Sequence, residues 1–383
     1  MTPLCVGILL LTILIIAGVA FVMLSGDGTD ATQSSGAGTE QNGNGGGTGT
    51  DAQGTVISKQ YGNMKPQRIQ MFGRTHMYQI PDNPVGTLVF FHGCGRSVQG
   101  FWPYHPEHAS DCYGLPEDVS HTKQALRRGY AFIALTPSSK GCWSMAAQDG
   151  PQTTELLEKL LRSNNLIDKP MYVAGASSGA GFSIRLQAYF EKVNTQLRIS
   201  GVMSEVNTNI SPLDGRGRLN ASNFPPVVWI LLEGDVASQR EAKEYVATVM
   251  KNKVPAAYFV APIRVITPDY FAERIPSFSK TQSQELTAAL KKVGLIDAQG
   301  KFKMDPSQGG WRSDLKRYVP TNERQYTLNF VKSAILQSLL VAYAYHEHVA
   351  DYTTAALMWF ENGGKSQFSD LAEKYKVTNP NAI

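Results

Sequence analysis

Residues 171–179 read MYVAGASSG, and this stretch decides the fold. Its apolar part, Met171–Gly175, has the length and composition of a buried strand, and a helix-like segment follows. A strand, a sharp turn and a helix in this order are the context in which a turn presents a serine nucleophile, here Ser177. Gly175 and Gly179 on either side let such a strained turn form without side-chain collisions.

Short apolar runs recur on both sides of this stretch, with helix-like segments between them. The further runs are Thr87–His92, Tyr130–Leu135, Ile199–Ser204 and Val227–Leu232, and a hairpin is predicted for Gln67–Phe72 and Thr75–Ile80. Continuous apolar runs are typical of parallel strands that are buried on both faces of a sheet. The alternation therefore predicts the α/β class, with a mostly parallel central sheet flanked by helices.

The alternation stops at about residue 261. Residues 262–325 are rich in Lys, Gln, Ser and Asp and contain only short helical pieces, which predicts an inserted helical cap or lid. The chain continues with a strongly apolar region, Leu328–Phe360, which we expect to be helical. We assign residues 56–383, cap included, to one α/β domain.

The composition excludes several classes of protein. Of 383 residues, 42% are hydrophobic and 18% are charged, which suits a sizeable core and excludes a disordered, collagen-like or coiled-coil chain. The net charge of +4 comes from interspersed residues without a basic run, so no nucleic-acid partner is expected. The four cysteines lack zinc-site spacing, and neither a metal nor another cofactor is expected.

The first 24 residues form a candidate transmembrane signal anchor. Leu4–Leu24 carries no charge and, at about 1.5 Å per residue, is long enough to cross a bilayer. Residues 25–55 are rich in Gly, Thr and Ser and are expected to be a flexible linker. We expect a single-pass type II membrane protein with a lumenal or extracellular domain, or alternatively a secreted protein cleaved after Ala20. Asn209 and Asn220 begin sequons and are candidate glycosylation sites.

A glycine-rich loop follows the strand predicted to end at His92. His92, Gly93, Cys94 and Gly95 lie where an α/β-hydrolase places a loop that binds the substrate oxyanion. We expect the Cys94 N–H to supply one contact to the oxyanion and the Ser178 N–H to supply the other. The alternative is a simple glycine turn. Cys94 as a thiol nucleophile is disfavoured because its place matches the oxyanion loop.

The chain order Ser…Asp…His selects the other members of a catalytic triad. Asp235 follows the strand Val227–Leu232 and is the expected acid, with Glu233 as the alternative. Only two histidines, His346 and His348, lie downstream of Asp235. Either could be the base, and a metal site formed by the two is disfavoured because no third ligand is evident.

Several motifs recur in an order that resembles a known group of proteins. They are FFHGCGRSVQGFW (90–102), CYGLPED (112–118), GCW (141–143), GASSG (175–179), LLEGDVASQ (231–239), FAERIP (271–276), AYAYHEH (342–348) and WFENGG (359–364). Together they resemble an uncharacterised group of the α/β-hydrolase superfamily that is best represented in plants. The resemblance implies Ser177 as the nucleophile, Asp235 as the acid and His346, of an A-Y-H-E motif, as the histidine.

These features predict a membrane-anchored serine hydrolase, most specifically a carboxylesterase that acts on a small-molecule or acylated substrate through an acyl-enzyme. A lipase or a serine peptidase is an alternative within the same chemistry. From another class, the alternative is a catalytically silent α/β-hydrolase fold used as a cell-surface binding protein. The intact set of nucleophile, acid, histidine and oxyanion glycines favours the enzyme, because a binding protein has no need of all four.

Three cysteines, Cys94, Cys112 and Cys142, lie outside the apolar N-terminal segment. An exported domain usually oxidises the thiols that it can pair. We predict a Cys112–Cys142 disulfide, because a bridge at Cys94 would constrain the loop whose N–H must meet the oxyanion. The alternative is three reduced thiols that serve only in packing.

Overall fold

The computed structural model describes residues 49–50, 56–57, 64–139, 141–207, 224–320 and 326–383. The predicted anchor (1–24), most of the predicted linker (25–55) and the two sequons at Asn209 and Asn220 lie outside the described residues. No helix in the described part of the chain is long and apolar enough to cross a membrane. Two short strands, β1 (Gly49–Thr50) and β2 (Val56–Ile57), pair with each other in antiparallel orientation.

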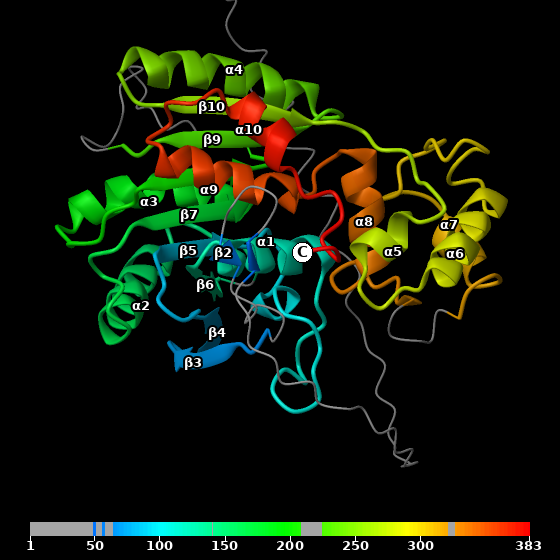
Figure 1. Cartoon of the computed structure of the whole chain (residues 1–383), viewed down its shortest axis with the longest axis horizontal. Coiled ribbons are helices and arrows are strands. Elements are labelled where there is room, and N and C mark those ends of the chain that lie inside the picture. Colours follow the sequence, from blue (N-terminus) through cyan, green and yellow to red (C-terminus); the bar gives the residue numbers. More distant parts are fainter. Residues whose placement is uncertain (1–48, 51–55, 58–63, 140, 208–223, 321–325) are drawn as a thin grey trace, which may run out of the picture. The chain divides into compact units, whose positions relative to one another are not determined.

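The centre of the domain is a sheet of eight strands in the order β10-β9-β8-β7-β5-β6-β4-β3 (Figure 1). The strands are β3 (Gln67–Met71), β4 (Arg74–Gln79), β5 (Gly86–Phe91), β6 (Tyr130–Leu135), β7 (Met171–Ala176), β8 (Gly201–Glu205), β9 (Val227–Leu232) and β10 (Ala256–Ala261). Neighbours from β10 to β6 are parallel, whereas β4 and β3 continue the sheet in antiparallel orientation. The predicted α/β class with a mostly parallel sheet is confirmed.

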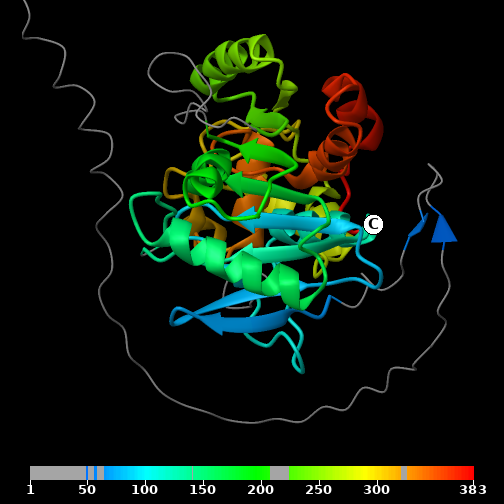
Figure 2. The same ribbon diagram turned by 90° about the vertical axis from the view of Figure 1, so that its left-hand side faces the viewer.

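Helices cover both faces of this sheet (Figure 2). One face packs against α1 (Pro116–Arg127), α9 (Thr353–Glu361) and α10 (Phe368–Tyr375), and the other against α2 (Asp149–Ser163), α3 (Ser178–Lys192) and α4 (Val236–Lys251). Along β5, Leu88 and Phe90 belong to the core on the α1 side of the sheet, and Val89 and Phe91 belong to the core on the α2 side. Side chains alternate between the faces of a strand, so a strand covered on both sides is apolar throughout.

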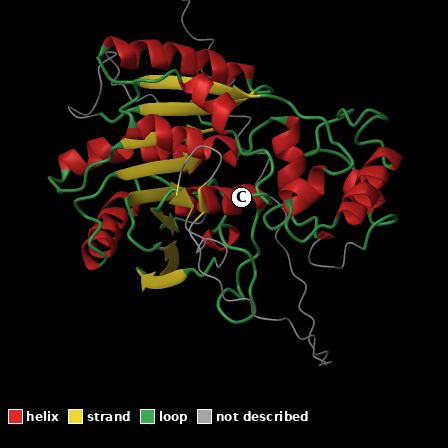
Figure 3. Ribbon diagram, in the orientation of Figure 1, coloured by secondary structure: helices red, strands yellow, loops and turns green. Residues whose placement is uncertain are grey.

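The segment predicted as a cap contains α5 (Tyr270–Arg274), α6 (Lys280–Lys292) and α7 (Trp311–Leu315), with loops between them (Figure 3). Figure 1 shows these helices beyond the carboxyl ends of the parallel strands. Together with α8 (Ala334–Tyr343) they bury a third apolar core, to which Phe271, Leu290, Trp311 and Leu339 contribute. The segment is therefore held mainly by its own core and by α8.

The apolar C-terminal region is not helical throughout, so the prediction for Leu328–Phe360 is wrong in part. Helix α8 ends at Tyr343, and α9 begins only after a short 3-10 turn, η4 (Ala350–Tyr352). Ala344 and His346 both adopt left-handed backbone conformations, with φ values of 56° and 47°. A left-handed residue after the last helical one ends a helix, and here it leaves His346 in a loop.

Candidate active site

Ser177 lies at a strained turn between β7 and α3. Its φ of 52° and ψ of −115° fall outside the conformations that residues with a side chain commonly adopt. A Cβ added to Gly179 would lie 1.9 Å from the Phe91 carbonyl oxygen, and one added to Gly175 would lie 2.5 Å from the Gly179 carbonyl carbon. Both positions therefore require glycine, because α3 begins in backbone contact with the ends of two strands.

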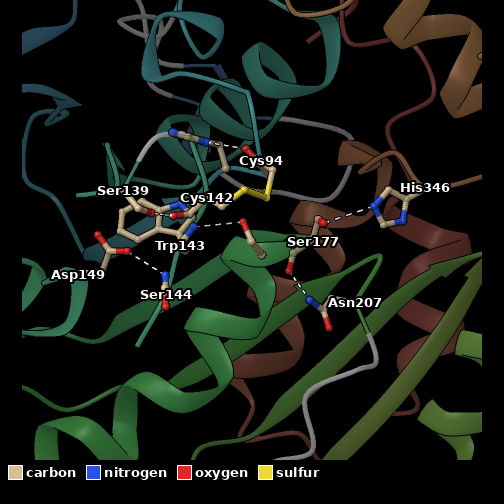
Figure 4. The surroundings of a disulfide bond; sticks show 12 residues. Cys94, Ser139, Cys142, Trp143, Ser144, Asp149, Ser177, Asn207 and His346 are labelled. Carbon is tan, nitrogen blue, oxygen red and sulfur yellow. Dashed lines mark hydrogen bonds between the residues drawn. A yellow bond between two sulfur atoms is a disulfide. The ribbon is translucent and has the colours of Figure 1, made fainter. Parts of the chain in front are cut away.

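The end of the neighbouring strand β8 holds this turn in place. The Ser177 N–H donates to the Glu205 carbonyl oxygen at 3.0 Å, and Asn207 Nδ2 donates to the Ser177 carbonyl oxygen (Figure 4). Sequence reasoning missed Asn207, which belongs to no motif. Its position could have been inferred only from the pairing of β7 with β8.

The loop between α8 and η4, called the histidine loop below, brings His346 to Ser177. The distance from Ser177 Oγ to His346 Nε2 is 3.3 Å, and Figure 4 shows the imidazole pointing toward the hydroxyl. The His346 side chain is exposed to solvent. Gly234 lies just after β9, and its N–H donates to the Ala344 carbonyl oxygen at 3.0 Å. This hydrogen bond fixes the histidine loop next to the end of β9. Of the two candidate histidines, His346 is thus the one that contacts the serine.

The structure does not bring the predicted acid into contact with this histidine. Asp235 caps α4, and its carboxylate accepts from the Ser238 N–H at 3.1 Å and from the Ser238 hydroxyl at 2.5 Å. No hydrogen bond or ion pair joins Asp235 to His346, although both lie in the described part of the chain. The alternative acid, Glu233, accepts from the Ile263 N–H at 2.7 Å. The role of Asp235 therefore remains a prediction.

The glycine-rich loop lies beside the serine. A Cβ added to Gly93 would lie 3.6 Å from Ser177 Cβ. The His92 ring is buried, and its Nδ1 lies 2.9 Å from the Gly93 carbonyl oxygen. Burial lowers the pKa of His92, so the ring is neutral and Nδ1 can act as the donor. His92 therefore supports the loop through the Gly93 carbonyl oxygen.

The predicted Cys112–Cys142 disulfide is wrong, because the structure pairs Cys94 with Cys142 (Figure 4). The Gly95 N–H donates to the Gly141 carbonyl oxygen at 2.9 Å and brings the two loops together. Cys112 is instead buried in the core on the α1 side of the sheet and forms no disulfide. The bridge thus anchors the glycine-rich loop directly beside the serine.

Ser178 links the serine turn to the loop that carries Cys142. Its Oγ accepts from the Trp143 N–H at 3.3 Å. The Trp143 ring packs edge-on against Phe91, with 4.8 Å between centroids, and lies 4.9 Å from Phe182. Ser178 is the first residue of α3, and the use of its N–H toward an oxyanion remains a prediction.

A buried charge cluster behind the histidine loop escaped sequence reasoning. Arg96 pairs with Glu347 at 2.5 Å, and His348 lies 2.8 Å from Glu347 and 3.3 Å from Asp118. Burial would lower the pKa of His348, but the Asp118 and Glu347 carboxylates raise it well above its usual range. Burial would likewise raise the pKa of Glu347, but Arg96 and His348 lower it to about 2. His348 is therefore a charged structural residue.

A second buried pair lies next to this cluster, beneath the serine turn. Glu205 Oε1 is 3.4 Å from His121 Nε2, and Glu205 Oε2 accepts from the Val349 N–H at 2.8 Å. Burial raises the pKa of Glu205 to about 8. Burial, together with the nearby charge of His348, lowers the pKa of His121 well below its usual value. Near neutral pH this pair is uncharged.

One group of described side chains could hold a metal ion. The ligand atoms of His105, Glu107 and His108 lie within 4.8 Å of one another. All three belong to the loop between a 3-10 turn, η2 (Val98–Gly100), and α1, and not to the turn that carries Ser177.

No protein-family model matches the chain, and no curated protein matches its sequence. Similar solved structures include a dienelactone hydrolase from Anabaena variabilis, at 15% identity and a TM-score of 0.36, over 52% of this chain and 88% of that one. An esterase/lipase from an uncultured bacterium is 12% identical over 57% of this chain and 80% of its own, with a TM-score of 0.35. A bacterial heroin esterase is 15% identical over 51% and 74%, with a TM-score of 0.35.

The assignment of the fold rests on the strand order and the serine turn of this chain itself. A mostly parallel sheet of eight strands, flanked by helices, with a strained Ser turn after a central strand defines an α/β-hydrolase-like protein. Its structural neighbours include esterases at low sequence identity.

Proposed function

We propose that this protein is a serine hydrolase, most specifically a carboxylic ester hydrolase that works through an acyl-enzyme. The observation that supports this proposal is the 3.3 Å distance from Ser177 Oγ to His346 Nε2, on a strained turn beside a glycine-rich loop. A serine hydroxyl becomes an effective nucleophile when a base within hydrogen-bond reach takes its proton. Since the imidazole is exposed, an ester can reach the pair from solvent.

In the proposed reaction, Ser177 Oγ attacks the ester carbonyl carbon while His346 Nε2 takes the hydroxyl proton. The N–H groups of Cys94 and Ser178 hold the oxyanion, aided by the N-terminus of α3. The tetrahedral intermediate collapses, and the alkoxide leaves with the proton from His346. Water, deprotonated by His346, then attacks the acyl-enzyme, and the carboxylic acid and free Ser177 are released.

Asp235 is the proposed third member of the triad. The Gly234–Ala344 hydrogen bond keeps its loop beside the histidine loop. We propose that its carboxylate turns from the Ser238 hydroxyl toward His346 Nδ1 in the working enzyme, where it would stabilise the imidazolium. If so, Asp235→Asn lowers kcat strongly, whereas Glu233→Gln has a small effect.

A second candidate function is that of a catalytically silent binding protein with the same fold. The observation that favours it is the bonding of both Asp235 oxygens to Ser238, with no hydrogen bond from Asp235 to His346 in the described part of the chain. Such a protein would bind ester or acyl ligands without turnover.

Labelling of the full-length protein by a fluorophosphonate probe separates the two candidates. We expect labelling and hydrolysis of p-nitrophenyl esters, and we expect Ser177→Ala to abolish both. Ser178→Ala is the matched control, because the variant keeps the backbone N–H and should retain most of the turnover. Labelling that persists in Ser177→Ala contradicts the nucleophile, and a folded parent protein that is never labelled supports the silent alternative.

The same preparation tests the substrate class. Soluble short-chain esters, emulsified long-chain esters and peptides can be compared at equal enzyme concentration. A preference for soluble esters supports a carboxylesterase, a gain on emulsions supports a lipase, and amide cleavage supports a peptidase.

We further propose that the protein belongs to the plant-type group that its motifs resemble, and that residues 1–24 anchor it with the domain outside the cytosol. The Cys94–Cys142 disulfide is in keeping with an oxidising compartment. An anchored chain stays with membranes after a carbonate wash and keeps its N-terminus, whereas a soluble chain that begins near Phe21 indicates a cleaved signal. A mass shift on glycosidase treatment would test Asn209 and Asn220.

A further inference from the structure

A large cavity lies where the 262–325 segment meets the sheet domain. Its volume is about 1230 Å³, above the usual range for small-molecule sites of roughly 300–1,000 Å³. Its walls are the loop before α1, the end of α5, the segment before α8, and Pro380 and Asn381. Neither Ser177 nor His346 lines this cavity, called the α1–α5 cavity below, so it is separate from the serine turn.

Four charged side chains line the cavity, and two of them have partners of opposite charge. Arg274 lies 2.5 Å from Glu117 and 3.0 Å from Asp351, both of which are buried. Asp111 lies 2.5 Å from Arg68. These two lining groups therefore carry little net charge into the cavity.

The other two are lysines that pair with no carboxylate in the part of the chain that the structure describes. Lys123 Nζ donates to the Pro380 carbonyl oxygen at 3.1 Å, and Lys332 Nζ lies 5.5 Å from the centroid of the Tyr113 ring. Burial lowers the pKa of Lys123, with no carboxylate to offset the loss of hydration. An anion beside Lys123 would restore that lost stabilisation.

Part of the remaining wall is apolar, beside polar residues such as Asn329 and Asn381. Leu115, Val119, Ile275 and Pro276 line the cavity together with the Tyr113 ring. A small inorganic anion would satisfy the lysines and leave these walls in contact with water. An uncharged lipid would cover the walls and leave the Lys123 ammonium buried without a counter-charge. The ligand that satisfies both features carries one acidic group on an apolar body.

We propose that the α1–α5 cavity binds an organic carboxylate with an apolar chain, with its acid group toward Lys123. The apolar chain packs against the first turn of α1 and the residues after α5. Because the cavity joins the 262–325 segment to the sheet domain, a bound carboxylate also bridges these two parts.

Calorimetric titration of the full-length protein with octanoate tests this site, with octanamide as a matched uncharged ligand. Octanoate should bind at least about tenfold more tightly than octanamide, the difference expected of one charge-assisted hydrogen bond. Lys123→Met should weaken octanoate binding by about tenfold and leave octanamide binding unchanged. Equal affinities for the two ligands, no binding of octanoate, or indifference to Lys123→Met would overturn the proposal.

Three controls distinguish the site from trivial effects. Lys291 is exposed and, like Lys123, donates to a backbone carbonyl oxygen, that of Ala298. Lys291→Met should not change octanoate binding. Lys123→Arg keeps the charge and should retain binding, which separates the loss of charge from misfolding. Protein carrying Ser177→Ala should bind octanoate as the parent does; a loss of affinity there would assign octanoate to the serine site and contradict a second one.

Discussion

Arg96 and Glu347 form a buried ion pair, with 2.5 Å between Arg96 Nη2 and Glu347 Oε2. Arg96 stands two residues after Cys94, and Glu347 directly follows His346. The Arg96 guanidinium also donates to the carbonyl oxygens of Phe330 and Val331, each at 3.3 Å. One side chain therefore joins the glycine-rich loop to the loop that presents the histidine.

Breaking this pair should cost both stability and turnover. Glu347→Gln leaves the Arg96 charge buried without a full partner, and we expect a loss of about 3–5 kcal/mol in the free energy of unfolding. We also expect kcat to fall more than KM rises, because the variant displaces His346 and not the bound ester. Denaturant unfolding and ester kinetics measure the two effects.

A double-mutant cycle with Arg96→Met compares the stability losses of the two single variants with that of the double variant. The double variant has no unpaired guanidinium, so its loss of stability should be smaller than the sum of the two single losses by at least about 1 kcal/mol. Strict additivity would show that the two residues act independently.

The disulfide should stabilise the fold and shape the site. Because Cys142 stands 48 positions after Cys94, replacing both by Ala is expected to cost about 2–4 kcal/mol. Turnover should also fall, since the loop that carries the Cys94 N–H loses its anchor. Peptide mapping without reduction should yield a linked Cys94–Cys142 peptide. Cys112→Ala should leave that peptide in place, and a linked peptide that contains Cys112 would refute the pairing.

Two glycine variants test the packing of the serine turn. Gly179→Ala places a methyl group 1.9 Å from the Phe91 carbonyl oxygen, so the backbone must move. We expect a loss of more than about 3 kcal/mol, or failure to fold. Gly93→Ala meets Ser177 Cβ only at 3.6 Å and should fold normally. Thermal unfolding of the two variants side by side checks this, and equal melting temperatures would contradict the close approach.

Stability should depend on pH through Glu205. Burial raises the pKa of its carboxyl group from the ordinary value of 4.5 to about 8. The folded protein keeps a proton that the unfolded chain releases above pH 4.5, so this group lowers stability as the pH rises from 4.5 to about 8.

Glu205→Gln holds the site neutral at every pH and should remove this dependence. The variant should gain stability relative to the parent by more than about 1 kcal/mol between pH 5 and pH 8 in denaturant unfolding. Glu285→Gln, on an exposed position of α6, should follow the parent. Parallel pH profiles for the parent and Glu205→Gln would show that Glu205 does not carry the effect.

Most of the sheet could be predicted from the sequence, because strands that are buried on both faces are continuous apolar runs. Runs such as Tyr130–Leu135 and Val227–Leu232 are apolar at every position, and both are strands with the predicted bounds. The edge strand β10 (Ala256–Ala261, AAYFVA) was missed, although it is apolar throughout like the others. The serine turn was recognisable because Gly175 and Gly179 must both be glycine for close backbone contact.

Other features depend on contacts between distant segments and leave no local pattern. The pairing of Cys94 follows from the Gly95–Gly141 backbone bond, which joins two loops. The histidine loop interrupts an apolar stretch. The Gly234 N–H donates to the Ala344 carbonyl oxygen and fixes this loop, and the sequence of α8 carries no sign of that contact. The sequence singles out Arg96 only as part of a motif, because its partner Glu347 lies 251 positions away.

The separation of Ser177 and His346 along the chain has a consequence for biosynthesis. The two residues stand 169 positions apart, and the 262–325 segment is made between them. A ribosome completes strands β3 to β9 and the serine turn well before it reaches the histidine. Growing chains, and fragments that end before residue 346, therefore carry the proposed nucleophile without the proposed base. Hydrolysis would begin only after α8 has been synthesised and the histidine loop has docked beside β9.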